Sequence, residues 1–490
     1  MIYPKYPDTY WSFRHALRFI SKKAAFPPLG LITVSAMLPK EWNRKLVDMN
    51  VEPLSGKDIQ WADYVFISAM YIQKDSVAKI LEECARYKAV VVAGGPLFTQ
   101  DYDSYPQIDH FILNEAELTL PSFLKDVEAG LPPKKVYSTN EYADITLTPI
   151  PDYQLLSQKD YVTMSIQVSR GCPFACDFCE ITSLWGHKVR IKSPSQVLAE
   201  LDQLYDLGWR GLVLIVDDNF IGNKPAVKHK LLPAMKAWMQ QHGHPFTFST
   251  QVSINLADDE PLMELMRDTG FSYTFIGIET PEEKSLQDCS KFQNNNRDLL
   301  QSVSKIQATG MQVAAGFIVG FDSDTPSIFQ RQIDFIQQSG IVSAMVGLLN
   351  APKNTKLYHR LMAENRLTTD GKGNYTDFAT NIIPKMSYTE LIEGYKKVVT
   401  SIYSAKPYYK RARNFLLTYK RAHTQTEKAD KANIAAFFKS IFILGVVKKG
   451  RTEFWKFLFW TLTRRPRMLK DAITFTIYGY HYRKVYDIST

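Results

Sequence analysis

Six short apolar segments separated by stretches of helical spacing constrain the fold of this chain more than any other feature. Strands that alternate with helices predict a parallel sheet with helices packed on it, and six such units predict a partial (β/α)6 barrel. In barrels of this kind the active site lies at the carboxyl ends of the strands. The expected strands are Val162–Ser169, Gly211–Asp217, Phe246–Val252, Tyr273–Ile278, Val313–Gly320 and Ile341–Leu348.

The helix expected over Ser193–Gly208 is the clearest of those between the strands. Ser193 is placed to cap it, and Pro194 suits its first turn. Val197, Leu201 and Leu204 then face the core.

Residues 1–140 show a second alternating pattern, which predicts a doubly wound α/β domain. Lys45–Asp48, Tyr64–Ser68 and Val90–Ala93 are brief apolar runs, and Lys74–Tyr87 has helical spacing. Ligands of such sheets bind beyond the carboxyl ends of the strands. The residues expected at those ends are Asp48, Asn50, Ser68, Gly94 and Gly95. A Gly-Gly pair there either lets a bulky ligand approach the backbone or makes a tight turn.

Four parts are therefore expected: an α/β domain (1–140), a linker rich in proline and polar residues (141–160), the partial barrel (161–350) and a helical, basic domain (351–490). Residues 401–490 carry 19 Lys/Arg and 5 Asp/Glu, a balance of +14 within a total of +9. The first 400 residues are left at −5, which indicates a basic tail rather than a generally basic protein.

Cys172, Cys176 and Cys179 lie on one short loop, SRGCPFACDFCE, after the first barrel strand. A [4Fe–4S] cluster has four irons, usually each held by a cysteine thiolate. Three thiolates would leave one iron open to S-adenosylmethionine, which can then be cleaved reductively to a 5′-deoxyadenosyl radical. The alternative is a zinc loop, but structural zinc prefers paired knuckles and a fourth ligand. The spacing favours the iron–sulfur cluster.

Cysteine usage and the chain ends indicate where the protein works. Three clustered cysteines out of five argue against a disulfide framework, and an oxygen-sensitive cluster needs a reducing compartment. The first residues lack the pattern of a secretory signal, and Ile441–Val447 is far shorter than a bilayer span. We expect a cytoplasmic enzyme.

With this cysteine loop and barrel, the chain resembles the radical S-adenosylmethionine superfamily. The resemblance implies that Phe178 packs near the adenine and that Glu279 contacts the ribose. It also implies that the segment after the second strand lies near the methionine amino group and that the fifth strand runs along the adenine. The residues concerned are Asp217, Asp218 and Asn219 in the first segment and Gly316 and Gly320 in the second. Ordinary barrel packing is the alternative for each.

The preceding α/β domain resembles the cobalamin-binding branch, which implies a flavodoxin-like fold. Ser68, Gly94 and Gly95 fit positions that hold the corrin nucleotide tail, and Glu115 belongs to a turn resembling the branch's Gly-Glu-x-Glu. The Asp-x-His-x-x-Gly segment of many cobalamin domains is here Asp48–Pro53, with Asn50 in place of the histidine. Cobalt would then lack an imidazole ligand. A relic domain that binds nothing is the alternative.

The resemblance implies a methyltransferase that uses methylcobalamin to methylate an unactivated carbon, and it is closest to the subfamily containing hopanoid C-2 methylases. The expected partners are a hydrophobic small molecule and an electron donor such as flavodoxin or ferredoxin, without nucleic acid. The alternatives are a cobalamin-dependent cyclase or ring-rearranging enzyme and a tRNA methylthiotransferase. The latter carries three further N-terminal cysteines, where this chain has only Cys84. A non-enzymatic cobalamin or redox sensor is disfavoured by the complete cysteine loop.

An aromatic helix with basic flanks is expected in the tail. Its apolar face would consist of Phe454, Phe457, Leu458 and Leu462, widened by Trp455, Phe459 and Trp460. Its flanks would be Lys448, Lys449, Arg451, Arg464, Arg465 and Arg467. Such a helix either lies on the anionic inner face of a membrane or covers the open side of the barrel.

Overall fold

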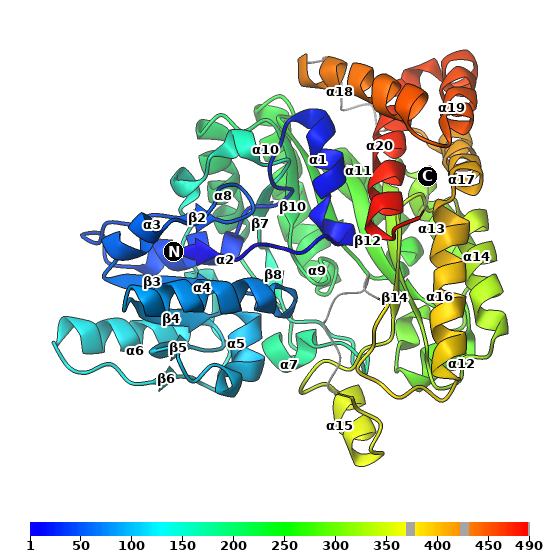
Figure 1. Cartoon of the computed structure of the whole chain (residues 1–490). Coiled ribbons are helices and arrows are strands. Elements are labelled where there is room, and N and C mark those ends of the chain that lie inside the picture. Colours follow the sequence, from blue (N-terminus) through cyan, green and yellow to red (C-terminus); the bar gives the residue numbers. More distant parts are fainter. Residues whose placement is uncertain (369–377, 422–430, 489–490) are drawn as a thin grey trace.

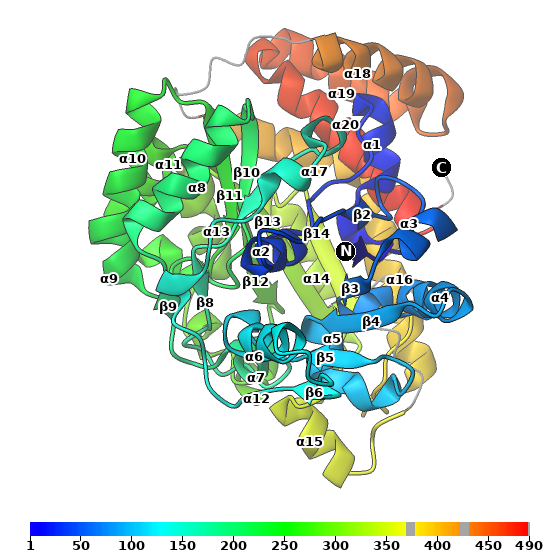
Figure 2. The same cartoon turned by 90° about the vertical axis from the view of Figure 1, so that its left-hand side faces the viewer.

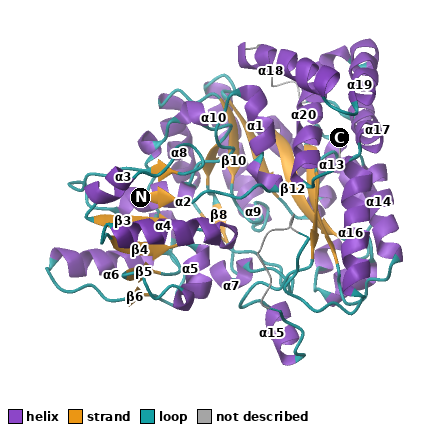
Figure 3. Cartoon of the chain, viewed as in Figure 1, coloured by secondary structure: helices purple, strands orange, loops and turns teal. Residues whose placement is uncertain are grey.

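The computed structural model describes residues 1–368, 378–421 and 431–488. Each of the two larger parts of the chain contains a parallel sheet flanked by helices, and the C-terminal helices pack beside the second sheet (Figures 1 and 3). The predicted α/β class with a helical C-terminal part is confirmed. The boundaries of the four predicted parts stay a prediction, and some residues of the last part lie outside the described ranges.

The first sheet has six parallel strands in the order β2-β1-β3-β4-β5-β6. They are β1 (Ile2–Tyr3), β2 (Val47–Asp48), β3 (Tyr64–Ser68), β4 (Val90–Gly94), β5 (His110–Ile112) and β6 (Val136–Tyr137). The order is that of a flavodoxin-like sheet, which binds ligands where the strand order reverses. Here that point lies between β1 and β3.

Helices cover both faces of this sheet. On one face lie α3 (Gly56–Trp61), α4 (Lys74–Arg86) and α5 (Pro96–Asp101), and on the other lie α2 (Leu29–Met37) and α6 (Ala116–Glu128). The helical spacing in α4 buries Val77, Ile80, Leu81 and Cys84, as expected. The doubly wound arrangement follows from these two separate apolar cores.

The second sheet has six parallel strands in the order β7-β10-β11-β12-β13-β14, and its edge strands β7 and β14 do not pair. They are β7 (Met164–Ile166), β10 (Gly211–Ile215), β11 (Phe246–Gln251), β12 (Phe271–Glu279), β13 (Gln312–Val319) and β14 (Ala344–Leu348). Each overlaps a predicted strand, so the partial six-unit barrel is confirmed. A short antiparallel ribbon, β8 (Ser169–Arg170) with β9 (Arg190–Ile191), flanks the cysteine loop.

Helices follow the barrel strands in turn (Figure 2). They are α7 (Ile181–Trp185), α8 (Pro194–Asp206), α9 (Lys224–Ala226), α10 (Leu232–Gln241), α11 (Glu260–Thr269), α12 (Glu283–Asp288), α13 (Leu299–Ala308), α14 (Ser327–Ser339) and α15 (Lys356–Ala363). The predicted cap of α8 is confirmed, because the Ser193 side chain accepts from the Gln196 amide at 3.3 Å. Val197, Leu201 and Leu204 are buried as expected.

The gap between β7 and β14 is closed by the two ends of the chain. Beside β7, the Val162 amide donates to the Ala24 carbonyl at 3.1 Å. Beside β14, the hydroxyl of Tyr482 on α20 (Leu469–Val485) donates to Ser343 at 3.1 Å. Tyr10, just before α1 (Arg14–Ile20), stacks on Tyr482 with ring centroids 4.6 Å apart. The N-terminal segment therefore spans from one barrel edge to the last helix.

The remaining C-terminal helices are α16 (Tyr388–Tyr403), α17 (Ala405–Thr418), α18 (Lys431–Phe442) and α19 (Arg451–Arg464), with one π-helical turn at Ile443–Val447. The prediction for α19 needs correction. Phe454, Phe457 and Leu458 are buried, and Phe457 stacks on Tyr409 of α17 at 5.1 Å, because this face packs against the fold. Leu462 and Phe459 are exposed, so α19 covers its neighbours with one face and offers a different apolar face to solvent.

Candidate active site

A cavity of about 1950 Å³ lies where the carboxyl ends of the two sheets meet. Ser68, the last residue of β3, lines one side, and Cys172, Asp218 and Glu279 line the other. Ligands of both sheets are expected at the carboxyl ends of the strands, and these two ends open into the same cavity.

The cavity continues into the barrel, where small side chains on two of its strands leave room beside the larger ones of β10 and β12. Ser165 on β7 and Thr247 and Ser249 on β11 line it. In closed (β/α)8 barrels, layers of bulky branched residues fill this interior. The alternation of large and small residues in β11, FTFSTQ, is a sequence signal for a hollow barrel.

The cysteine loop reaches the cavity with all three side chains. Cys172, Cys176 and Cys179 line it, and none is in a disulfide. Gly171 has φ +91°, and a Cβ there would lie 2.7 Å from the Lys188 carbonyl oxygen, so the turn into the loop requires glycine. Three free thiols facing one space fit a cluster held at three irons.

A lysine, a glutamine and a fourth cysteine surround this loop, and the sequence prediction missed all three. Gln293 Nε2 lies 3.6 Å from Cys176 Sγ. Lys291 lines the cavity; burial opposes its charge, but Glu279 and Cys176 raise its pKa above the usual range. The Cys289 carbonyl accepts from the Asp177 amide at 3.0 Å, and burial raises the pKa of the Cys289 thiol. Cys289 does not line the cavity.

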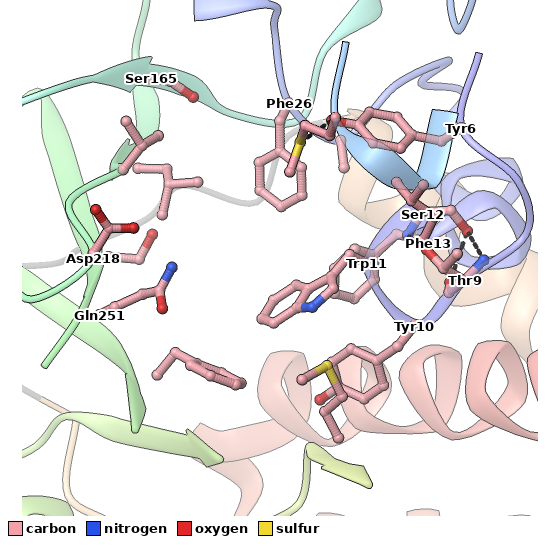
Figure 4. A pocket seen from close by; sticks show the side chains of 18 of the residues that line it. Tyr6, Thr9, Tyr10, Trp11, Ser12, Phe13, Phe26, Ser165, Asp218 and Gln251 are labelled. Carbon is pink, nitrogen blue, oxygen red and sulfur yellow. Dashed lines mark hydrogen bonds between the residues drawn. The ribbon is translucent and has the colours of Figure 1, made fainter. Parts of the chain in front are cut away.

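Asp217 and Asp218 follow β10, and their side chains point in different directions. Asp217 is buried away from the cavity, where it accepts from the Val168 amide at 2.8 Å and the Ser169 hydroxyl at 2.5 Å. Asp218 points into the cavity (Figure 4). Burial, with help from Asp217, raises the pKa of Asp218 to about 7. Asn219 also lines the cavity and accepts from the Ser253 amide at 3.2 Å.

Glu279 and Phe178 lie on the cluster side of the cavity, linked by Lys291. The Lys291 ammonium donates to Glu279 Oε1 at 2.8 Å and lies 5.9 Å from the Phe178 ring centroid. Glu279 has φ +66°, which is uncommon for a residue other than glycine and costs backbone energy. The fold therefore holds Glu279 at the end of β12 in a backbone conformation that glutamate does not favour.

Gly316 on β13 and Gly320, which directly follows that strand, do not line the cavity. A Cβ at Gly316 would lie 3.2 Å from the ring of Phe275, which does line it. Gly320 faces Leu391 of α16. The structure therefore places these two predicted contacts one layer behind the cavity wall.

At the first sheet, Asn50 and Ser68 line the cavity, whereas Asp48, Gly94 and Gly95 lie behind them. Asp48 is buried and accepts from the Asn50 side chain at 2.8 Å and from the Tyr161 hydroxyl at 2.9 Å. Gly95 has φ +90°, and a Cβ there would lie 2.6 Å from Ser68 Oγ. Asp48, Gly94 and Gly95 therefore support the carboxyl edge of the first sheet without lining the cavity.

Glu115 lies in an ion-pair network outside the cavity lining. Its carboxylate pairs with Arg170 at 3.3 Å and Arg190 at 2.7 Å, and Arg170 also pairs with Glu117 at 2.7 Å. The Glu115 side chain is fully buried. The network ties the first sheet's domain to the ribbon beside the cysteine loop.

Aromatic residues of the N-terminal segment form a wall that the sequence prediction missed. Trp11 and Phe26 project toward Asp218 and Gln251 from the opposite side of the cavity (Figure 4). The Trp11 ring lies 5.0 Å from that of Phe275 on β12. The run TYWSF was the available signal, but its distance in sequence from the barrel concealed it.

Comparison with known families agrees with this arrangement. The radical SAM superfamily profile matches residues 166–336, and a domain of unknown function matches 355–490. An uncharacterised methyltransferase of Synechocystis is 40% identical over 100% of this chain and 92% of its own. The hopanoid C-2 methylase of Rhodopseudomonas palustris is 33% identical over 94% of this chain and 89% of its own.

Two solved structures share the fold. The cobalamin-dependent S-adenosylmethionine radical enzyme OxsB, with aqua-cobalamin and S-adenosylmethionine bound, matches with a TM-score of 0.63 at 16% identity, over 94% of this chain and 77% of its own. The radical S-adenosylmethionine methyltransferase TsrM of Kitasatospora setae matches with a TM-score of 0.56 at 15% identity, over 69% and 73%.

Proposed function

The chain belongs to the cobalamin-binding radical S-adenosylmethionine enzymes, in the family of hopanoid C-2 methylase, and from this membership we propose that it methylates an unactivated carbon of a hydrophobic polycyclic lipid. When bound, the cluster and S-adenosylmethionine supply a radical that removes a hydrogen atom, and methylcobalamin supplies the methyl group. The protein's task is to hold the substrate between them and to exclude water.

One observation carries the proposal: the cysteine loop, the ligand edge of the first sheet and an aromatic hollow belong to the same cavity. Hydrogen abstraction and methyl transfer must act on one substrate carbon, so the two cofactors and the substrate need a common space. Trp11 and Phe275 offer flat apolar surfaces within it. Such surfaces suit a rigid ring system.

The residues of the cavity wall divide between the two cofactors. Cys172, Cys176 and Cys179 would hold the [4Fe–4S] cluster, which a donor such as flavodoxin or ferredoxin would reduce. Phe178, Asp218, Asn219, Glu279 and Lys291 would contact S-adenosylmethionine. Tyr6, Asn50, Ser68 and Met70 would border cobalamin at the point where the first sheet's strand order reverses.

The assay is product analysis with methyl-labelled S-adenosylmethionine and a pentacyclic triterpenoid under anaerobic reducing conditions. We expect label in the triterpenoid product together with 5′-deoxyadenosine. Unlabelled but altered product would instead indicate cyclisation or rearrangement. Absence of any triterpenoid product, while S-adenosylmethionine is cleaved, would refute the lipid substrate.

A peripheral membrane contact is the second element of the proposal. We define the α18–α19 surface as the exposed apolar residues of these helices and the turn between them: Ile434, Phe438, Phe442, Val446, Val447, Trp455, Phe459 and Leu462. The stripe on α18 joins that on α19 because the Trp455 indole donates to the Gly445 carbonyl at 2.9 Å.

Charge identifies an anionic bilayer as the partner of this surface. Residues 434–468 carry eight Lys/Arg and one Glu. Basic residues around exposed aromatics are typical of elements that lie in the headgroup region of anionic membranes. No helix in the described part of the chain is both long and apolar enough to cross a bilayer.

A further inference from the structure

The cavity has a second end at the amino ends of the barrel strands, opposite the cofactors. Gly211, Thr247 and Gln312, which begin or lie near the start of β10, β11 and β13, line it there. Asp218 lines its other end. At a rise of about 3.3 Å per residue, β10 is about 13 Å long from Gly211 to Ile215, and Asp218 lies three residues beyond its end. The hollow barrel thus has the shape of a channel.

The far end, which we call the second mouth, is lined by Gln312, Tyr419, Arg421, Lys470, Asp471 and Thr474. Lys470 is exposed, so the channel reaches solvent here. The Tyr419 hydroxyl donates to the Gly310 carbonyl at 3.1 Å, two residues before Gln312 in sequence. Burial, with Asp471 nearby, raises the pKa of Tyr419 to about 12. These contacts bring α17, the start of α20 and β13 together.

Two polar atoms of the second mouth have no partner within the described part of the chain. Asp471 Oδ1 pairs with Arg421 at 2.9 Å, but its Oδ2 is buried without a hydrogen bond. Gln312 Nε2 is likewise buried without one. Buried polar atoms are nearly always satisfied, so an unpaired acceptor and an unpaired donor in one mouth point to a ligand.

We propose that the second mouth binds the hydroxylated end of an elongated amphiphile whose apolar end reaches the cofactors. The inference rests on the proposed lipid substrate and specifies its shape and polarity. Hydroxyl groups both accept and donate, so a hydroxylated ligand can accept from Gln312 Nε2 and donate to Asp471 Oδ2. An ionised carboxylate has no proton to donate to Asp471. The chemical class is therefore an alcohol, with one or more hydroxyl groups at the end that the mouth holds.

The surroundings of the mouth supply an entry route. Ala16, Leu17 and Ile20 of α1 line the same cavity. Lys439 of α18 donates to the Arg18 carbonyl of α1 at 3.3 Å, so the α18–α19 surface adjoins this end of the molecule. An amphiphile drawn from a bilayer can enter apolar end first and keep its hydroxyl groups at the mouth.

The test uses dodecyl maltoside with a diazirine on its sugar, photo-crosslinked to the full-length protein and mapped by mass spectrometry. We expect labels on Tyr419–Arg421 or Lys470–Thr474. Gln312→Glu replaces a hydrogen-bond donor with an acceptor, and Asp471→Asn replaces an acceptor with a donor. Each variant should lower the crosslinking yield about tenfold. The double variant restores one donor and one acceptor, so its yield should recover.

Matched controls are Asp75→Asn and Gln287→Glu, which alter exposed residues elsewhere and should label as the wild type does. Labels at Lys5–Tyr6 or the cysteine loop, or single variants equal to the wild type, would overturn the inference. Labelling needs neither reductant nor S-adenosylmethionine. Failed methyl transfer with correct labelling would therefore refute the proposed function, and labelling elsewhere with intact methyl transfer would refute only the mouth.

Discussion

Lys291 and Glu279 form an ion pair, with Nζ 2.8 Å from Oε1, at the edge of the cavity beside the cysteine loop. Their side chains are only 13% and 9% exposed. The pair holds a positive charge next to thiolates and fixes the carboxylate at the end of β12. It therefore links the barrel strand to the loop that would carry the cluster.

Lys291→Met should lower the free energy of unfolding by about 3 kcal/mol, because it leaves a buried carboxylate unpaired. Glu279→Gln combined with Lys291→Met should recover most of that loss. If Glu279 contacts the ribose, the double variant should still bind S-adenosylmethionine weakly. Urea unfolding and equilibrium dialysis separate the two effects, and recovery of both stability and binding would assign the pair a structural role alone.

The cysteines provide a second prediction. Cys176→Ala should lose the cluster and S-adenosylmethionine cleavage, because one iron loses its thiolate. Cys289→Ser is the matched control: Cys289 lies close by, but its buried thiol does not line the cavity. It should keep about four irons per chain. Iron and sulfide analysis after anaerobic reconstitution measures both. Iron loss in Cys289→Ser would show that the cluster uses a fourth cysteine.

The order of elements could be predicted from the sequence because it depends on local periodicity. Each barrel strand overlaps its expected segment, and β3 matches Tyr64–Ser68 at both ends. β1 has two residues and β5 has three, which is too few for a period to be detected. The positions of β1 and β5 in the sheet depend instead on hydrogen bonding to the neighbouring strands. The course of residues 9–27, across the barrel gap, depends on contacts with α20 that no local pattern reveals.

The residues of the site likewise divide into those that local sequence patterns predict and those that only tertiary packing brings together. The sequence predicts four residues that line the cavity, through the spacing of Cys172, Cys176 and Cys179 and through the position of Asp218 at a strand end. Lys291 and Trp11 were missed because tertiary packing alone brings them there. Glu115 fits a cofactor-binding turn in the sequence, and the fold places Arg170 and Arg190 beside it, which no local pattern reveals.

Asp218 makes stability depend on pH. Its pKa in the folded protein is about 7, above the ordinary 3.8, because burial disfavours the charged form. Between these values the folded state binds more protons than the unfolded state, so this stabilising contribution is complete below pH 3.8 and is lost as pH rises through about 7.

Asp218→Asn removes this dependence, so it should stabilise the protein by about 4 kcal/mol at pH 8 and by only about 1.6 kcal/mol at pH 5. Asp217→Asn is the contrasting variant. It weakens hydrogen bonds to Val168 and Ser169 and should destabilise the protein at both pH values. Thermal unfolding across this range measures the difference. Equal effects of Asp218→Asn at pH 5 and pH 8 would contradict the raised pKa.

The α18–α19 surface gives the last prediction. Removing the residues after Lys448 is not a clean test, because the deleted part includes Tyr482, which is buried against the barrel. Point changes avoid this: Phe438, Phe442 and Phe459 are 63%, 63% and 70% exposed, so serine there should leave the fold intact. The triple serine variant should bind anionic liposomes at least tenfold more weakly, since each phenylalanine contributes roughly 1.5–3 kcal/mol when fully buried.

The matched control is Trp61→Ser, which removes an aromatic side chain that is 54% exposed on the first sheet's domain. It should sediment with anionic liposomes as the wild type does. Binding of the wild type should fall as salt rises, because screening weakens the attraction of Lys449 and Arg451 to anionic headgroups. Neutral liposomes should bind less than anionic ones. If the triple variant and Trp61→Ser bind equally well, the exposed aromatics of α18 and α19 do not contact the membrane.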